Sequence, residues 1–379
     1  MNVTLTSFGS WSGGRFMNFG QPIDEDRWIR LVRSAYDQGV RTFITADVYG
    51  LGKADELLGR ALQGIPRDSY CLVGTVGHDF YATRRDGAKG YPRFTDPQLR
   101  SSQDYASYLR SAVEKSLTRC QASAFDVVLL HNPDSIGYTQ DSVWNGMQKL
   151  VDAGLTRELG VAPGPANGFT LDLLLCFERF GALLDWAMII LNPFEPWPGS
   201  LLLPAAQRFD IPLITRVVDF GGIFHDDVRP GHAFGTADHR VFRPPGWVDD
   251  GFGKLQKLRP IAERHGLTAL QLACAWNLAH EPVRNVVPTL IEEVGTGDKS
   301  IETKLAELAA VRKVNLSEEE IATIHAVGDN RGCMALKGAN RSHLGSPQPD
   351  VWGITPELDA VARRWGIEPD RDLVLLHAA

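Results

Sequence analysis

Residues 42–50 read TFITADVYG, and residues 54–62 read ADELLGRAL. The first stretch opens with β-branched and aromatic residues and ends at a Tyr-Gly pair, while the second carries apolar residues at helical spacing. A strand that leads through a short loop into a helix is the repeating unit of an α/β fold. We therefore predict a strand over 42–46 and a helix over 54–62, and we expect this unit to recur.

The same alternation continues on both sides of this unit. Strands are predicted at 3–8, 71–75, 127–130, 158–161, 188–191, 213–217 and 286–289, which makes eight with 42–46. Helices are predicted between them at 26–36, 105–118, 143–151, 171–180, 202–208, 268–278 and 301–311. Eight strands separated by helices favour a parallel sheet, and a (β/α)8 TIM barrel closes such a sheet without an edge. An open doubly wound sheet is disfavoured because no GxGxxG motif follows the first strand.

Two long connections interrupt this rhythm. They span residues 77–104 after the third strand and residues 219–250 after the seventh. Loops of this length are uncommon unless they are functional, and barrel enzymes place their sites at the carboxyl ends of their strands. We therefore expect the two loops to roof a pocket.

The end of the chain differs from the barrel. Ser317 and Glu320 have the spacing of a capping box, which predicts a last helix that ends at residue 327. The residues after it contain Gly, Pro and charge without sustained periodicity. We assign residues 1–327 to the barrel and residues 328–379 to a C-terminal extension packed on it.

The composition limits the class of protein. Hydrophobic residues make up 44% of the chain, yet no uninterrupted apolar run is long enough to predict a membrane span. The net charge of −7 lacks the basic excess of a nucleic-acid binder, so a small molecule is the expected partner. Five cysteines without CxxC spacing, and an N-terminus without a signal-peptide pattern, favour a cytoplasmic protein. The sequence leaves the oligomeric state open.

The stretch that ends at Tyr49 resembles the aldo-keto reductase signature. In that signature a strand ending in Asp-Thr-Ala leads to a Tyr-Gly loop and then to a Ser-Glu-x-x-Leu-Gly helix. Further matches follow in the family's order at 126–131 (DVVLLH), 154–161 (GLTRELGV) and 286–288 (VVP), so the resemblance covers about residues 1–327. It implies a TIM barrel, an oxidoreductase that acts on a carbonyl or sugar-like small molecule, and NADP or NAD as the cofactor.

The resemblance implies catalytic roles for Tyr49 and His131. In the family a tyrosine gives a proton to the carbonyl oxygen, a histidine orients the substrate, and a lysine paired with an aspartate lowers the pKa of the tyrosine. Tyr49 and His131 keep their family positions, but Ile44 stands in place of the aspartate and Thr75 in place of the lysine. Because one member of a buried ion pair is costly without the other, their joint absence indicates a rebuilt site.

The resemblance implies fewer residues for the cofactor. Asn192 would hydrogen-bond the nicotinamide carboxamide, and Trp197 would offer a stacking face. Lys299 and Lys304 are the candidates for the adenosine phosphate, because they follow the last strand in the segment that grips this phosphate in the family. Two glutamates at 292–293 lie in the same segment, and we expect them to repel a phosphate.

The two long loops also begin with candidate metal ligands. His78 and Asp79 follow the third strand, while His225 and Asp226 follow the seventh. Imidazole and carboxylate groups suit zinc or manganese, so their convergence with His131 would make a divalent metal site. A solvated polar rim is the simpler interpretation of the same residues.

Three functions therefore stay open. The first is an aldo-keto reductase-like oxidoreductase with a rebuilt active site, and it describes the sequence best. The second is a lyase, isomerase or hydrolase on the same barrel, which would use Tyr49 and His131 for acid–base chemistry, or a divalent metal, and no nicotinamide. The third is a non-catalytic binding module. Among the charged residues that could replace the missing pair, Arg216 lies closest to a strand end.

Overall fold

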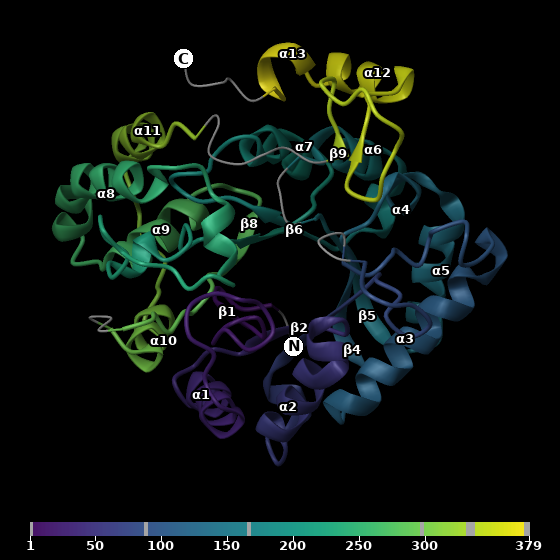
Figure 1. The fold of residues 1–379 in the computed structure, drawn as a ribbon, viewed down its shortest axis with the longest axis horizontal. Helices are drawn as coiled ribbons and strands as arrows, with labels where there is room; N and C mark the ends of the chain where they lie inside the picture. The colour runs from purple at the N-terminus through teal and green to yellow at the C-terminus, as the bar shows by residue number, and fades with distance from the viewer. Residues whose placement is uncertain (1–2, 87–89, 165–167, 296–298, 331–337, 375–379) are drawn as a thin grey trace.

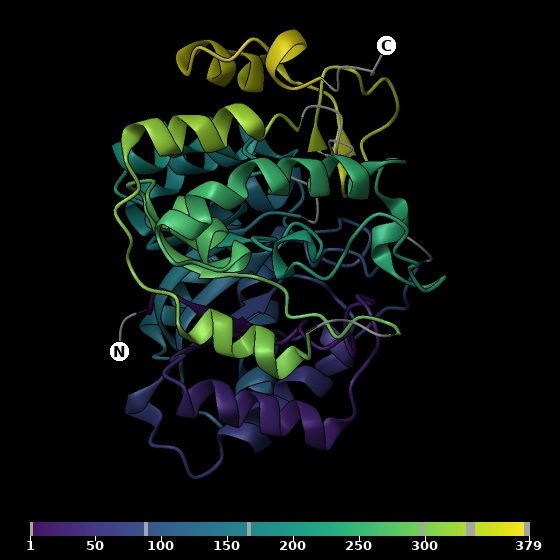
Figure 2. The ribbon, with the colours of Figure 1, turned by 90° about the vertical axis from the view of Figure 1, so that its left-hand side faces the viewer.

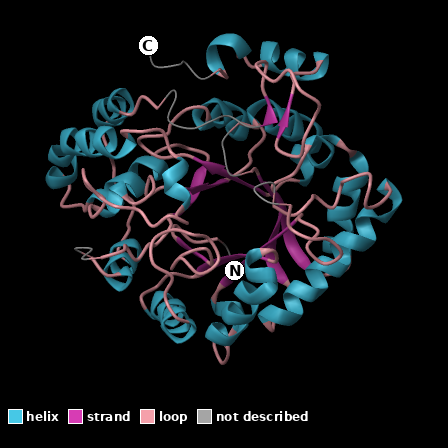
Figure 3. Cartoon of the chain, viewed as in Figure 1, coloured by secondary structure: helices cyan, strands magenta, loops and turns pink. Residues whose placement is uncertain are grey.

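The computed structural model describes residues 3–86, 90–164, 168–295, 299–330 and 338–374. Eight parallel strands form one sheet in the order β1 to β8. A parallel bridge between Thr6 and Val286 brings the last strand back to the first. Figures 1 and 3 show the strands as a ring with the helices around it. The predicted (β/α)8 barrel is confirmed.

The order of elements follows the sequence prediction. The strands are β1 (Ser7–Gly9), β2 (Thr42–Ala46), β3 (Cys71–Val76), β4 (Phe125–His131), β5 (Thr156–Ala162), β6 (Trp186–Ile190), β7 (Leu213–Arg216) and β8 (Val283–Val287). The helices up to residue 327 are α1 (Glu25–Asp37), α2 (Lys53–Leu62), α3 (Tyr105–Cys120), α4 (Ser135–Thr139), α5 (Asp141–Asp152), α6 (Thr170–Phe180), α7 (Leu203–Arg208), α8 (Trp247–Arg264), α9 (Ala269–Leu278), α10 (Ile301–Ala309) and α11 (Glu318–Val327). Every predicted strand overlaps an observed one, although β1 is shorter than the predicted 3–8. Thr4 there bonds to the side chain of Thr42 instead of the backbone of β2.

Local sequence determines where the helices begin. The Asp24 side chain accepts a hydrogen bond from the Arg27 backbone N–H and caps α1, whose apolar stripe, which includes Trp28, is buried. The predicted capping box of α11 is present, with Ser317 and Glu320 each bonded to the backbone N–H of the other. The main helical patterns therefore carry their own start signals.

One long helix, α8, was not predicted. Pro260 lies inside it, and a proline inside a helical pattern normally indicates a break. The helix nevertheless buries Leu255 and Leu258 against the barrel, and it begins at Trp247, so the second long loop is shorter than the predicted 219–250. The first long loop agrees with the predicted 77–104, since β3 ends at Val76 and α3 begins at Tyr105. Among the helices of the described ranges, none is both long and apolar enough to cross a membrane.

Two apolar clusters make up the core. The larger one lies between the strands and the surrounding helices. The smaller one fills the inside of the barrel and includes Trp11, Ile44, Cys71, Val73, Val127, Leu129, Met188, Ile214 and Val287. Because side chains alternate along a strand, the inner cluster identifies which residues of each strand face inward. The inward-facing rows end at the carboxyl edge of the barrel.

The residues after α11 form a small extension. It contains β9 (Gly338–Ala339), β10 (Val351–Trp352), α12 (Pro356–Arg364) and α13 (Pro369–Asp372). In Figures 1 and 2 it lies outside α6, against which α12 packs. The Trp352 indole N–H donates to Asp172 on α6 at 3.0 Å, and the Trp197 indole N–H donates to the Asp372 carbonyl at 2.5 Å. Through these contacts the extension packs on the barrel.

Candidate active site

Three polar side chains end the inward-facing rows at the carboxyl edge of the barrel. They are Thr75 on β3, His131 on β4 and Arg216 on β7. The inner-cluster residues two positions before them are Val73, Leu129 and Ile214. Because side chains two positions apart share a face of a strand, all three polar residues point to the inside of the barrel at its mouth.

Tyr49 reaches the same mouth from the turn after β2. Its ring packs edge to face on His131, with centroids 5.8 Å apart, and on Trp11 at 6.3 Å. The turn continues through Gly50 and Leu51, both with a φ of 58°, a left-handed conformation that glycine adopts at low cost. The Tyr49 hydroxyl bonds to none of the residues that the structure describes. The structure thus brings together the two predicted catalytic residues.

Burial determines the charge of both residues. It raises the pKa of Tyr49 to about 12, although the positive charge of Arg216 opposes this rise. It lowers the pKa of His131 to about 3, and the charges of Arg93 and Arg216 lower this pKa further. At neutral pH, Tyr49 therefore holds its proton and His131 is uncharged. Neither ring nitrogen of His131 has a hydrogen-bond partner within the described ranges.

The positions of the family's ion pair hold uncharged side chains. Ile44 is fully buried in the inner cluster, and the Thr75 hydroxyl is buried without a hydrogen-bond partner among the described residues. Asp47 follows on the same turn and is also fully buried. Burial, together with the negative charge of Asp55, raises the pKa of Asp47 well above its usual value, which favours its neutral form. A positive charge that lowers the pKa of Tyr49 therefore has to come from a residue at another position.

His78 forms one wall of the mouth at the start of the first long loop. Its ring lies edge to face with His131, at 5.2 Å between centroids. Burial and the charge of Arg93 lower the pKa of His78 well below its usual value, so the ring is neutral. Its Nδ1 lies 3.1 Å from the Tyr91 carbonyl and its Nε2 lies 3.1 Å from the Asn132 amide nitrogen. With Nδ1–H as donor to Tyr91 and Nε2 as acceptor from Asn132, both of these contacts are hydrogen bonds, and the Arg93 Nη1 at 3.2 Å from Nδ1 is a close contact without one.

Arg93 links this wall to the C-terminal extension. Its guanidinium is buried, donates to the Asn132 carbonyl, and pairs with Asp350 at 2.5 Å. Sequence reasoning missed both residues of this pair, because 257 positions separate them and no motif marks either one. The first long loop therefore lines the site, and the extension supplies it with a carboxylate.

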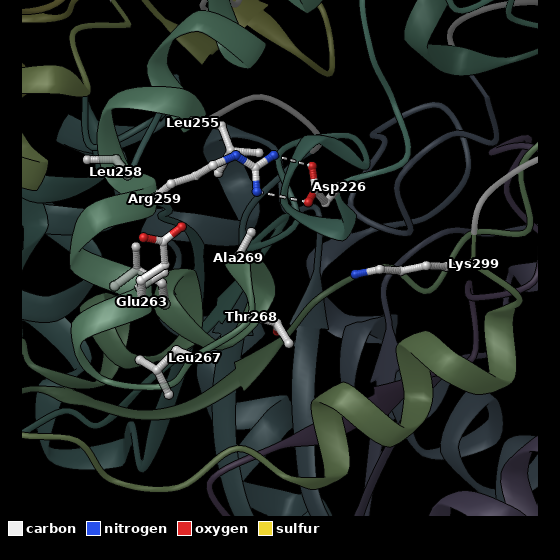
Figure 4. A pocket seen from close by; sticks show the side chains of 11 residues that line it. Asp226, Leu255, Leu258, Arg259, Glu263, Leu267, Thr268, Ala269 and Lys299 are labelled. Atoms are coloured by element: carbon white, nitrogen blue, oxygen red, sulfur yellow. Dashed lines mark hydrogen bonds and ion pairs between the residues drawn. The ribbon is translucent and has the colours of Figure 1, made fainter.

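The other predicted metal ligands lie apart from His131. His225 is fully buried, and its Nε2–H donates to the Thr289 carbonyl at 2.7 Å. Asp226 pairs with Arg259 at 2.6 Å, as the dashed lines in Figure 4 show, and Asp79 pairs with an arginine of its own loop. Within the described parts of the chain, no group of three or more His, Cys, Asp or Glu is arranged to hold a metal ion.

The side chains predicted to hold the nicotinamide are already engaged. The Asn192 amide nitrogen donates to Glu195 at 2.8 Å and to the Val217 carbonyl at 2.9 Å, and its oxygen accepts from the Phe194 backbone N–H at 2.9 Å. Trp197 is 9% exposed and its indole N–H is bonded to the extension. Neither side chain offers a free hydrogen-bonding group to a ligand.

The two predicted phosphate-binding lysines are also paired. Lys304 is fully buried, forms an ion pair with Asp227 at 2.5 Å and donates to the Ile291 carbonyl. Lys299 pairs with Glu307 at 2.7 Å. A sequence signal could have shown the burial of Lys304, because it shares helical spacing with the buried residues Ile301, Leu305 and Leu308. Both lysines are therefore bonded to other groups of the chain.

The glutamates at 292–293 are held in ion pairs. Glu292 accepts from the backbone N–H of Ile301, the first residue of α10, at 2.8 Å and pairs with Arg27 at 3.1 Å. Glu293 is buried and pairs with Arg240 at 2.7 Å. A helix N-terminus attracts anions through its free N–H groups. The chain's own Glu292 carboxylate occupies this position on α10.

Two cavities lie away from Tyr49 and His131. Figure 4 shows one of about 200 Å³, lined by α8, the start of α9, Asp226 and Lys299. The other measures about 970 Å³ and lies at the opposite end of the barrel, where its lining includes Trp186, the first residue of β6. The candidate site is therefore identified by strand position and chemistry, not by cavity size.

Comparison with known sequences agrees with the fold. The model of the Aldo/keto reductase family matches residues 7–329. A probable voltage-gated potassium channel subunit beta from Oryza sativa subsp. japonica is 24% identical over 304 residues, which cover 77% of this chain and 85% of the relative. A probable aldo-keto reductase 1 from Glycine max is 24% identical over 325 residues, which cover 83% of this chain and 84% of the relative.

Solved structures show the same architecture. A glycerol dehydrogenase from Gluconobacter oxydans has a TM-score of 0.67 at 22% identity, over 85% of this chain and 90% of that chain. An aldo/keto reductase from Klebsiella pneumoniae in complex with NADP and acetate has a TM-score of 0.55 at 20% identity, over 86% of this chain and 96% of that chain. At these identities the likeness shows the fold alone.

Proposed function

Because this chain belongs to the aldo/keto reductase family, a family of oxidoreductases, we propose that it reduces the carbonyl group of a sugar-like small molecule in a rebuilt active site. The observation that carries this proposal is the edge-to-face contact of Tyr49 with His131 at the barrel mouth. The Tyr49 hydroxyl has no partner among the described residues, and neither ring nitrogen of His131 has one. Both side chains are therefore available to a carbonyl oxygen.

Tyr49 suits the role of proton donor. A carbonyl oxygen takes up a proton as its carbon is reduced, and a positioned acid accelerates this step. With a pKa raised to about 12 by burial, Tyr49 holds its proton at neutral pH. The protonated hydroxyl can therefore give its proton to the carbonyl oxygen, with the neutral His131 orienting that oxygen.

Arg216 is the cation that we propose in place of the family's lysine. It lies at the end of β7, and its positive charge opposes the rise that burial causes in the pKa of Tyr49. The positive charge near Tyr49 therefore comes from Arg216 on β7, whereas the position of the family's lysine on β3 holds Thr75. This replacement is what we mean by a rebuilt site.

NADP or NAD is the cofactor that we propose, as the family implies. The relative from Klebsiella pneumoniae was solved with NADP. In this chain the predicted side chains Asn192, Lys299 and Lys304 do not fit the role, because each is engaged with protein groups. A nicotinamide would have to be held by other groups of the barrel mouth.

Two alternative functions each have one supporting observation. The engaged cofactor residues favour a lyase, isomerase or hydrolase that needs no nicotinamide. The similarity to proteins named as probable potassium channel beta subunits favours a non-catalytic binding module.

Fluorescence titration with NADPH and NADH, followed by an assay on aldehydes and sugars, separates the three functions. For the reductase we expect binding of a reduced nicotinamide and its oxidation in the presence of substrate. Absence of binding of both nucleotides would exclude the reductase. Binding without turnover on any carbonyl compound would favour the binding module.

A further inference from the structure

Arg216 is a cation without a counter-ion. Its Nη2 donates to the Pro163 carbonyl at 3.1 Å and to the Gly164 carbonyl. Its Nε and Nη1 have no acceptor, and no carboxylate pairs with it, among the described residues. The negative charge that acts on it from nearby is that of Glu195, which is itself engaged with Arg243 at 3.4 Å.

The hydrogen bonds of Arg216 place its guanidinium in the mouth. The sheet order puts β6 between β5 and β7, so a side chain from β7 that bonds to Pro163 and Gly164 crosses the end of β6. Those two residues directly follow Ala162, the residue of β5 that pairs with His131. The guanidinium therefore lies beside His131, and its charge acts on both His131 and Tyr49.

Burial destabilises the charged form of Arg216. Withdrawal from water lowers its pKa, and among the described residues the charge of Glu195 opposes this without forming an ion pair with Arg216. Arg93 also lies at the mouth, and its charge is offset by an ion pair with Asp350 at 2.5 Å. Arg216 therefore differs from Arg93 in that no carboxylate of the described residues forms an ion pair with it.

We propose that the site binds an oxo acid, with its carbonyl oxygen at Tyr49 and His131 and its carboxylate at Arg216. This inference rests on the proposed reductase function and adds the substrate class to it. A carboxylate carries the single negative charge that Arg216 lacks, and either the free Nε–H or a free Nη1–H can donate a charge-assisted hydrogen bond to it. A phosphate ester is a poorer fit, because its second charge would need a cation and Arg93 is already neutralised by Asp350.

A paired series of substrates tests the proposal. Oxo acids from glyoxylate to 5-oxopentanoate are compared with their methyl esters, which keep the carbonyl and lose the charge. For at least one chain length, kcat/KM should be about tenfold or more higher for the acid, as expected for a hydrogen bond to a charged group. In Arg216→Gln the ratio of kcat/KM for the acid to kcat/KM for its ester should fall to about one. Because the loss of the Arg216 charge from Tyr49 and His131 affects both substrates alike, this ratio isolates the contact with the carboxylate. Arg216→Lys should restore part of the preference.

Arg259→Gln is the matched control, since it removes one positive charge from an arginine that pairs with Asp226 outside the mouth. It should leave the preference unchanged, so that a loss in Arg216→Gln is assigned to the site and not to net charge. The wild-type protein supplies a second measurement that does not depend on the folding of a variant. Its KM for the acid should rise with ionic strength, and its KM for the ester should not. Equal kcat/KM for acid and ester at every chain length would overturn the proposal.

A binding experiment separates this proposal from the reductase function. Saturation-transfer NMR compares 4-hydroxybutanoate with 1,4-butanediol and needs no turnover. We expect transfer to the hydroxy acid in the wild type and its loss in Arg216→Gln. If neither the acids nor the esters are reduced but this difference is seen, the reductase function fails and the carboxylate site stands. Equal saturation transfer to 4-hydroxybutanoate and 1,4-butanediol would contradict the proposed carboxylate site.

Discussion

The rings of Tyr49 and His131 meet edge to face, with their centroids 5.8 Å apart. The two residues come from the ends of β2 and β4, and β3 lies between these strands in the sheet. Tyr49 therefore has a neutral imidazole as its close polar neighbour, since burial and two arginine charges lower the pKa of His131 to about 3.

Replacing Tyr49→Phe should lower the reductase rate by about 10² to 10⁴, because the variant loses the general acid. The phenylalanine ring keeps the contacts with Trp11 and His131, so Tm should stay within about 2 °C of the wild type. Steady-state kinetics and thermal unfolding of the same preparation check both statements. Wild-type turnover in the variant would show that Tyr49 only packs.

The contribution of His131 to the free energy of unfolding should fall as the pH falls from about 6.5 to about 3. In this range the unfolded chain binds a proton at His131 that the folded protein does not bind, because burial lowers the folded pKa to about 3. Above 6.5 both states are neutral at this residue and the contribution is fully present. In His131→Gln the free energy of unfolding should therefore change less between pH 7.5 and pH 5.0. Urea unfolding at the two pH values measures the difference, and an equal or larger change in the variant would contradict it.

Nicotinamide binding should show no strong demand for a 2′-phosphate, because Glu292 holds the N-terminus of α10. In Glu292→Gln the affinity for NADPH should rise relative to NADH, since a negative charge near the expected phosphate is removed. Glu302→Gln is the control, because Glu302 also pairs with Arg27 but does not accept from the Ile301 N–H. Fluorescence titration of both nucleotides against the three proteins gives the ratios. Tight, phosphate-selective binding by the wild type would refute the prediction.

Local patterns in the sequence predicted the barrel well, since each unit carries its own signal. The buried stripe that contains Trp28 marks α1, and alternation along β4 brings His131 to the inside two positions after Leu129. The helix α8 was missed because Pro260 masks its pattern. The helix α12 of the extension was overlooked, although Thr355 caps it, Pro356 begins it and its buried residues Leu358, Val361 and Ala362 have helical spacing.

The proximity of Tyr49 and His131 was predictable from the sequence, because the resemblance places both residues after strands at the same edge of the barrel. The pairing of Arg93 with Asp350 depends on the tertiary fold, and so does the absence of a counter-ion for Arg216. Lys304 was assigned to the cofactor from its position alone, whereas its helical neighbours turn it into the core, where it pairs with Asp227.

Restoring the family's ion pair with Ile44→Asp and Thr75→Lys should reveal a strong coupling. Both positions face the inside of the barrel on neighbouring strands, with Ala46 opposite Thr75 in the register. Ile44→Asp alone places a carboxyl group in a fully buried apolar cluster, and Thr75→Lys alone adds an unpaired ammonium. In the double variant each charge has a partner. The loss of unfolding free energy should therefore be smaller than the sum of the single losses, by about 0.5 to 3 kcal/mol in a urea double-mutant cycle.

The activity of the same double variant distinguishes the two enzymatic hypotheses. In a reductase with a rebuilt site, the new ammonium stabilises tyrosinate, so the pKa of Tyr49 should fall below about 12 and carbonyl reduction should increase. The shift is measured from the alkaline limb of the pH–rate profile, with Tyr49→Phe in the same background as the control. In a lyase or isomerase, Ile44 and Thr75 instead shape the pocket, and the native reaction should collapse. Full retention of the native activity with an unchanged pH profile would show that neither position touches the chemistry, and the active site would have to be sought elsewhere on the barrel.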